Sequence, residues 1–259
     1  MNTSSISAKL EAVDFSVIDE LSGLRPEDAF PIIEKALVHS NPDVRELGIL
    51  ALDKRPEAAA TDLLMKSLLD EDESVQLASI RALMKRPAKR MIPELRKILD
   101  DVDPDVQPEI VLLMGMCDDP GQIEYLQQML VKAQSGNQEE LSTNCNLALA
   151  RLGEARARNR IMARFESEYV EDRRDALGDI EYIHDPKLLV PLTSLLNDTV
   201  MAMDIGKDPE HVYLRLCDLF VLSANAVLGR PFPFAERGRA FSEDERRIVA
   251  SYIEQHIKR

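Results

Sequence analysis

The stretch HSNPDVRELGILALDKR, residues 39–55, decides the fold because the chain repeats its pattern twice more without a gap. The two further copies are DEDESVQLASIRALMKR, residues 70–86, and DVDPDVQPEIVLLMGMC, residues 101–117. Val44, Val75 and Val106 therefore recur at a spacing of 31 residues. A fixed period of this length is typical of proteins that are built from stacked structural repeats.

Each repeat predicts two amphipathic helices joined by a short polar turn. Turn-forming and acidic residues, such as Asn41-Pro42-Asp43 and Asp72-Glu73-Ser74, precede the valines and are typical of helix starts. The segments PIIEKAL, DLLMKSL and PELRKIL, beginning at Pro31, Asp62 and Pro93, carry apolar residues at helical spacing. One such pair cannot bury its own apolar face, so neighbouring pairs are expected to stack.

The second half of the chain repeats the pattern more loosely. A fourth unit runs over residues 120–153 and a fifth over 155–185. A sixth begins at Pro186 and continues, after a long linker at 198–210, in a predicted helix over 212–229. We therefore expect an all-α, right-handed α-solenoid of about six helical hairpins over residues 26–229.

The two ends are expected to act as caps of the solenoid. Residues 1–25 predict a helical cap over the first repeat. Residues 230–259 predict a loop followed by a capping helix, which begins at Ser242 with Glu245 in the position of a capping box.

The chain resembles HEAT-repeat proteins, and in particular the bacterial HEAT-like or lyase-type repeat group. The resemblance rests on Pro31, Pro93 and Pro191, on the acidic turns, and on the Val44-Arg45 start of a second helix. It implies a ladder in which turn aspartates bind helix arginines of neighbouring repeats. Gln76 and Gln107 replace the arginine here, so the ladder is expected to be incomplete. This resemblance covers residues 26–229, and such a fold serves many functions.

Composition and charge narrow the classes of partner. The 259 residues carry a net charge of -14, with 46 acidic and 32 basic side chains. An acidic surface repels nucleic acid and anionic membranes and attracts basic partners. The three cysteines form no CxxC pair and the N-terminus has no apolar signal segment. We expect a cytoplasmic protein whose partner is another protein or peptide, and neither nucleic acid nor membrane.

The sequence predicts no catalytic, metal or cofactor site, and hence a protein that is not an enzyme. Di-iron hydroxylases built on HEAT repeats carry repeated His-Glu pairs, and this chain has no His-Glu step. Phosphate-binding, zinc-protease and serine-hydrolase motifs are also missing from the sequence. The four histidines stand apart, with His184 in an expected turn: His39, His184, His211 and His256.

Two sets of residues are candidates for binding a partner. The first set lies on second helices, which normally line the concave face of a solenoid, and offers mixed charge that suits a protein or peptide: Arg45, Glu46, Gln76, Glu109, Arg174 and Asp175. The second set is Arg156, Arg160 and Arg164, which are four residues apart and so share one helix face. This stripe either binds phosphate or an acidic peptide, or is a solvated face paired with nearby glutamates.

Two irregular segments add further candidates. The insertion within the sixth repeat carries Val200, Met201 and Met203 and is either a functional contact or disordered. The tail phenylalanines, Phe232, Phe234 and Phe241, either anchor an interface or pin their own loop to the last repeat.

We expect a non-enzymatic, protein-binding solenoid, acting as a scaffold, adaptor or inhibitor through its concave second-helix face. One alternative is an acidic immunity-type inhibitor of a basic toxin, because the net charge is strongly negative. A second alternative, implied by the resemblance alone, is a bilin lyase-like subunit that acts on a tetrapyrrole-bearing protein.

Overall fold

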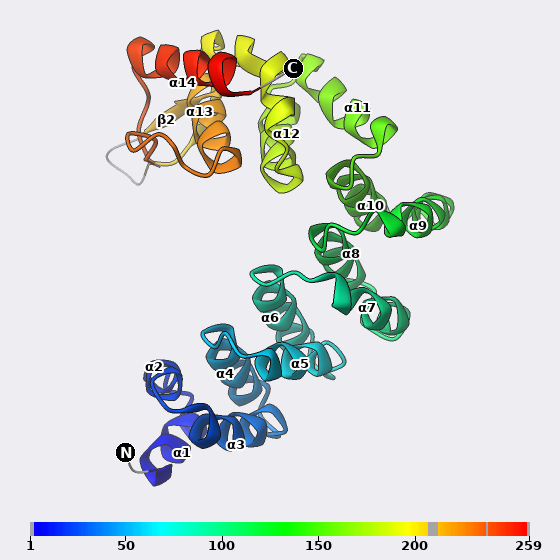
Figure 1. Ribbon diagram of the computed structural model, residues 1–259, viewed down its shortest axis with the longest axis vertical. Coiled ribbons are helices and arrows are strands. Elements are labelled where there is room, and N and C mark those ends of the chain that lie inside the picture. The colour runs from blue at the N-terminus through cyan, green and yellow to red at the C-terminus, as the bar shows by residue number, and fades with distance from the viewer. Residues whose placement is uncertain (1–2, 207–211, 237, 258–259) are drawn as a thin grey trace. The chain divides into compact units, whose positions relative to one another are not determined.

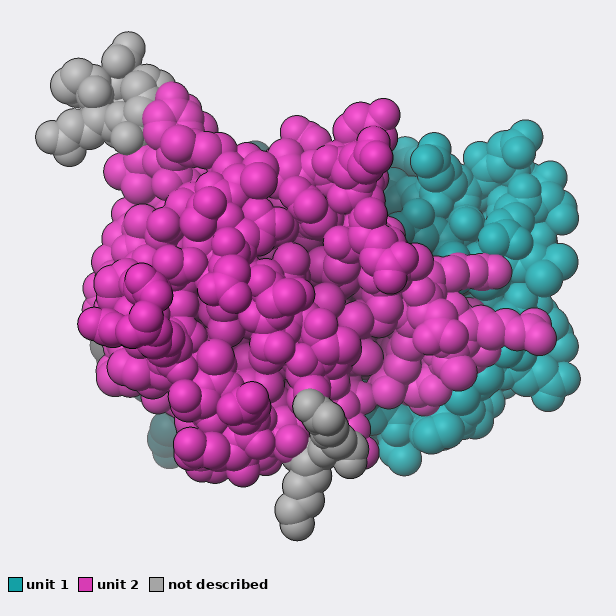
Figure 2. Space-filling model, turned by 90° about the horizontal axis from the view of Figure 1, so that it is seen from above, with its two compact units in different colours: residues 1–148 teal, residues 149–259 magenta. Residues whose placement is uncertain are grey.

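The computed structural model describes residues 3–206, 212–236 and 238–257 and divides into two compact units, Met1–Ala148 and Leu149–Arg259. Figure 2 colours the two units separately. Helices in sequential pairs build both units, as Figure 1 shows along the chain. The predicted all-α solenoid of HEAT-like hairpins is thereby confirmed as a fold class.

Unit 1 begins with two short helices and continues in four hairpins, of which the last helix, α10, ends beyond the unit boundary. The helices that come first in the chain are α1 (Thr3–Glu11) and α2 (Ser16–Ser22). The hairpins are α3 (Pro26–Leu37) with α4 (Pro42–Asp53), α5 (Ala58–Ser67) with α6 (Glu73–Met84), α7 (Ile92–Ile98) with α8 (Gln107–Met116), and α9 (Ile123–Ser135) with α10 (Glu139–Arg151). Short 3-10 turns, η1 (Lys89–Met91) and η2 (Pro120–Gln122), lead into α7 and α9. The second helices α4, α6 and α8 pack on one another in succession.

The predicted starts of α4 and α6 are confirmed, because a side chain caps each helix there. Asn41 accepts a hydrogen bond from the Asp43 amide at 3.0 Å, and Asp72 accepts one from the Ser74 amide at 2.9 Å. α3, in contrast, begins at Pro26, so Pro31 lies inside the helix rather than at its start. The regular part of α8 begins only at Gln107, later than the alignment predicts. Pro108 has no amide hydrogen to donate to the preceding turn, which explains that late start.

Arginines at the ends of the second helices connect successive repeats. Arg55 follows α4 and donates to the Leu21 carbonyl at 2.9 Å, at the end of α2. Arg86 follows α6 and donates to the Asp53 and Arg55 carbonyls, each at 2.6 Å, at the end of α4. A guanidinium at a helix C-terminus satisfies free carbonyl groups and complements the helix dipole. The third repeat has the buried Cys117 at this position, so this series ends there.

Unit 2 continues the hairpins with more irregular geometry. Its elements are α11 (Ala155–Ala163), η3 (Arg164–Glu166), α12 (Val170–Ile183), the 3-10 helix η4 (Pro186–Asn197), β1 (Met201–Asp204), β2 (Tyr213–Arg215), α13 (Leu216–Val227) and α14 (Glu243–His256). α12 and η4 both pack against α13, and α14 packs against η4 and α13. Pro191 lies inside η4, where it removes one backbone donor.

A two-stranded antiparallel sheet stands where the sequence predicted a linker and the start of a helix. In its register Met203 pairs with Leu214 and Asp204 with Tyr213. The helix prediction over 212–215 was therefore wrong, and α13 begins at Leu216. Asp218 accepts a hydrogen bond from the Arg215 amide at 3.0 Å, which fixes the N-terminus of α13 at this point.

The C-terminal helix begins as predicted. Ser242 accepts from the Glu245 amide at 3.3 Å, and Glu245 accepts from the Ser242 amide at 2.8 Å, which completes the capping box. Phe232 and Phe241 are buried and Phe234 is half-buried. The tail phenylalanines therefore pin their loop, and of the two readings of this segment the structure supports that one.

Across the described residues, the helices are too short or too polar to cross a lipid bilayer.

Candidate functional site

A half-open cavity of about 610 Å³ lies in unit 2, between α12, the β1–β2 hairpin, α13 and the tail loop. Its volume is in the range of ligand and side-chain pockets in proteins. Its lining is mainly apolar: Leu177, Met203, Ile205, Leu214, Leu219 and Leu222. The cavity thus lies where a predicted second helix meets the predicted insertion.

The face of α12 toward the cavity consists of residues one helical turn apart. Arg174, Gly178 and Glu181 lie at helical spacing, so that their side chains share one face of the helix. Gly178 sits in the middle of this face, and a Cβ atom added there would meet no atom within 4 Å. Because Gly178 has no side chain, this part of the cavity stays open.

The hairpin contributes an exposed apolar surface next to the cavity, here called the hairpin patch and defined by five residues: Val200, Met201, Met203, Ile205 and Tyr213. Each of these side chains is at least 39% exposed. A soluble protein rarely exposes so many large apolar side chains side by side. Met203 and Ile205 belong both to the patch and to the cavity wall. Patch and cavity are therefore one continuous feature at these two residues.

Polar contacts fasten the walls of the cavity to one another. Arg174 Nε donates to the Asp175 carboxylate at 2.9 Å, and Arg174 Nη1 lies 3.5 Å from the Ala202 carbonyl on the hairpin. The Ser223 hydroxyl of α13 donates to Glu181 Oε1 at 2.7 Å. Within the described part of the chain, Glu181 has no cationic partner at ion-pair distance. Of the two carboxylates in the described lining, Asp175 is paired with a cation and Glu181 is bound by a neutral hydroxyl.

The structure brings only Arg174 and Asp175, of the predicted second-helix set, into this site. Arg45 is buried, with its guanidinium on the Asp70 carboxylate at 2.7 Å and 2.9 Å. Gln76 is buried as well and donates to the Asp70 carbonyl at 2.5 Å. Arg45 therefore connects two successive repeats, as the expected rung of the arginine ladder, whereas Gln76 bonds within the turn of its own repeat. Neither buried side chain is offered to a partner.

Glu46 and Glu109 are half-buried in unit 1 and do not line the cavity. Burial raises the pKa of the Glu109 carboxyl, and the charge of Glu140 raises it further, while Arg81 opposes both. Glu109 thus sits in an acidic part of the second-helix face of unit 1.

The predicted arginine stripe is not continuous. Arg156 and Arg160 are exposed on α11, which ends at Ala163. Arg164 belongs to the 3-10 turn η3 and forms an ion pair with Asp179 of α12. The turn directs Arg164 toward the Asp179 carboxylate. The prediction that all three arginines share one helix face was therefore wrong for Arg164.

The remaining reactive side chains have structural surroundings. Burial raises the pKa of the Cys145 thiol to about 12, which keeps it protonated, and Cys117 and Cys217 are also buried. His184 has a left-handed backbone at the end of α12, which confirms its turn position, and His211 lies outside the described residues. Among the described residues, His, Cys, Asp and Glu side chains form no group of three or more that could hold a metal ion.

Sequence reasoning missed Gly178 and Glu181 and the apolar wall. One signal was present, because a glycine inside an amphipathic helix pattern often marks a packing or functional position. The wall itself combines segments that are far apart in the chain and share no period, such as Leu177 and Met203.

The comparison with family models agrees with the repeat pattern. The family model described as HEAT repeats matches residues 6–84 and 64–140, which together span just over half of the chain. Among solved structures, human deoxyhypusine hydroxylase in complex with glycerol is similar at 14% sequence identity, with 88% of this chain and 95% of that chain covered and a TM-score of 0.42. Among curated proteins, none matches the sequence of this chain.

Proposed function

Because this chain belongs to the HEAT-repeat family, we propose that it is a non-enzymatic helical scaffold that binds a protein partner. The observation that carries this proposal is the apolar cavity of unit 2, with the hairpin patch beside it. Proteins of this architecture bind partners through surfaces to which successive helices contribute matched positions. α12 and α13 supply such positions here, and the hairpin adds an apolar wall.

The hairpin patch favours a protein as the occupant. Large contiguous apolar surfaces on soluble proteins mark interaction sites, and methionine adapts its shape to varied partners. Full burial of a large apolar side chain contributes about 1.5–3 kcal/mol. Met203, Ile205 and Tyr213 are 39–48% exposed, so a partner that covers them gains somewhat less than half of this from each. The apolar cavity next to these residues provides a pocket for an anchor side chain.

The charge of the chain favours a basic partner. The net charge of -14 accelerates association with a basic surface and makes the affinity fall with salt. Inhibition of a basic protein is one form that this function takes.

The test fills the cavity with a side chain. Gly178→Phe places a ring where a Cβ meets no neighbour, and Glu254→Phe adds the same ring on an exposed position of α14. Both variants and the unchanged chain are immobilised, exposed to native lysate and eluted with high salt, and the captured proteins are quantified by mass spectrometry. We expect a protein that is captured by the unchanged chain and by Glu254→Phe and is reduced at least about tenfold by Gly178→Phe.

Equal capture by all three chains would remove the cavity from the function. Circular dichroism and thermal unfolding of Gly178→Phe check that the variant retains its fold, so that a loss of capture reports on the cavity.

A further inference from the structure

We infer that the cavity of unit 2 takes a peptide segment in which a bulky apolar side chain lies next to a lysine or arginine, with that cation on Glu181. This inference rests on the proposed function and specifies the chemistry of the partner. It follows from the combination of an apolar lining with one carboxylate that has no cationic partner among the described residues.

The first step concerns Glu181. Its side chain is half-buried on the cavity wall, and its hydrogen bond comes from the neutral Ser223 hydroxyl at 2.7 Å. A carboxylate accepts several hydrogen bonds, so Glu181 retains acceptor capacity toward the cavity. In an apolar environment an ionised group gains most from a charged, hydrogen-bonding partner.

The second step excludes the neighbouring arginine as that partner. The Arg174 guanidinium already contacts the Asp175 carboxylate at 2.9 Å and faces the Ala202 carbonyl at 3.5 Å. Arg174 and Asp175 therefore balance each other, and among the described lining residues Glu181 adds one negative charge that no cation there compensates. In the described lining, an anionic ligand would face two carboxylates and one guanidinium that is already paired.

The third step concerns the apolar part of the segment. Gly178 leaves open space in the centre of the α12 face, one turn before Glu181. Leu177, Leu219 and Leu222 line the same cavity, and Met203 and Ile205 adjoin it from the hairpin. A cation on Glu181 and an apolar side chain beside Gly178 are thus within the reach of adjacent or nearly adjacent residues of one peptide.

The experiment selects peptides and then measures a coupling. The full chain is immobilised and a phage library of random heptapeptides is selected on it. A selected peptide is synthesised with a fluorophore, together with a version in which its lysine or arginine is replaced by glutamine. Affinities of both peptides are measured by fluorescence anisotropy for the unchanged chain, for Glu181→Gln, and for Glu171→Gln, an exposed control on α12.

The expected result is a motif with an apolar residue beside a basic one, and binding that Gly178→Phe abolishes. Glu181→Gln should weaken the basic peptide about tenfold and leave the glutamine peptide within twofold, whereas Glu171→Gln should change neither. Raising the salt concentration should reduce this difference between the two peptides.

Three outcomes would overturn the inference. The first is a set of cavity-dependent peptides without a basic residue, or with equal affinity for Glu181→Gln, which leaves protein binding intact and removes the cation. The second is that Gly178→Phe lowers the affinity of no selected peptide. The lysate capture experiment tests the proposed function independently of this result. The third is a dimer, seen by sedimentation, that Gly178→Phe dissociates, because the occupant is then a second copy of this chain.

Discussion

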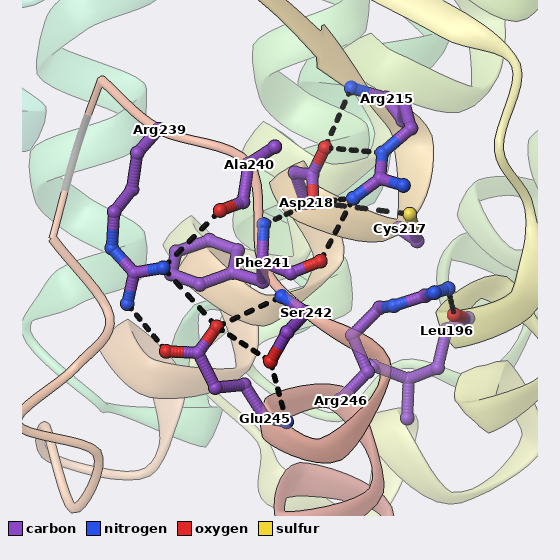
Figure 3. Close-up of polar contacts among 10 residues, drawn as sticks. All are labelled: Leu196, Arg215, Cys217, Asp218, Arg239, Ala240, Phe241, Ser242, Glu245 and Arg246. Carbon is purple, nitrogen blue, oxygen red and sulfur yellow. Dashed lines mark hydrogen bonds and ion pairs between the residues drawn. The ribbon is translucent and has the colours of Figure 1, made fainter.

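Asp218 of α13 accepts a hydrogen bond from the backbone amide of Phe241 at 2.8 Å, although the two residues are 23 positions apart in the chain. Figure 3 shows that Arg215 completes the connection, with its Nη2 donating to Asp218 Oδ1 and to the Phe241 carbonyl, each at 2.8 Å. This network fastens the tail loop to the start of α13. Because Gly238 of the same loop lines the cavity, the network also supports the candidate site.

Asp218→Ala should destabilise unit 2 strongly. Burial alone would raise the pKa of the Asp218 carboxyl, but hydrogen bonds from Arg215 and from the Phe241 amide hold it below its ordinary value, so the group is ionised and paired. Its removal leaves the half-buried Arg215 guanidinium without its carboxylate and the Phe241 amide without its acceptor, and we expect a loss of about 3 kcal/mol in the free energy of unfolding. Urea unfolding measures this loss, with the exposed Asp244→Ala as control. A loss as small as that of the control would contradict the structural role of the network.

The stability of the chain should decrease between about pH 4 and pH 6 through Asp179. Burial raises the pKa of this carboxyl to about 6 from an ordinary 3.8; Asp175 adds to the shift, and Arg164 opposes it. The folded chain therefore binds more protons than the unfolded chain in this window, so stability is present below about pH 4 and is lost as the pH rises through 6.

Asp179→Asn removes this dependence. We expect its free energy of unfolding, relative to the unchanged chain, to increase by about 2–3 kcal/mol between pH 4 and pH 7. Thermal and urea unfolding at a series of pH values measure the difference, in which the other titrating groups cancel. A difference that is constant with pH would show that Asp179 titrates normally.

The helical repeats could be predicted from the sequence because their cause is local and periodic. Val44 and Val75 are buried at equivalent positions, and the polar residues before them cap α4 and α6. The same alignment also contained Arg55 and Arg86 at equivalent positions, but only the structure shows that both contact the preceding helical unit. Whether a given side chain points to a neighbouring repeat or to solvent is not encoded in the period, and Arg45 was therefore assigned to the surface.

The cavity could be predicted only in part. Arg174 belonged to the predicted second-helix set, and Met203 lay in the insertion that the pattern marked as unusual. Their meeting depends on the β1–β2 pairing, which joins residues on both sides of a segment without periodic apolar positions. Short strands of this kind are stabilised by tertiary contacts more than by their own propensity, and the apolar run that follows Tyr213 resembled a helix start.

Arg86→Ala should weaken the contact between the first two repeats. Its guanidinium donates to the Arg55 and Asp53 carbonyls at 2.6 Å, at the C-terminal end of α4. Hydrogen bonds from a charged donor contribute about 1.5–3 kcal/mol when they are partly buried, and we expect a loss in this range. The exposed Lys54→Ala serves as control in the same urea experiment. Equal losses for the two substitutions would show that the hydrogen bonds of Arg86 contribute no more to stability than an exposed side chain does.

Two helix glycines provide a matched comparison for the open space at Gly178. Both Gly178 of α12 and Gly48 of α4 lie inside helices, where alanine is favoured over glycine by about 0.5–1 kcal/mol. A Cβ atom at Gly178 would meet nothing within 4 Å, whereas at Gly48 it would lie 3.1 Å from Leu37 Cδ2 and 3.4 Å from Ala36 Cβ. Gly178→Ala should therefore stabilise the chain by about 0.5–1 kcal/mol, and Gly48→Ala should give a smaller gain or a loss. Thermal unfolding measures the stability of the two variants. A larger gain for Gly48→Ala than for Gly178→Ala would contradict the open space beside Gly178. Because a methyl group takes little of the 610 Å³ cavity, Gly178→Ala should also retain the binding that Gly178→Phe abolishes.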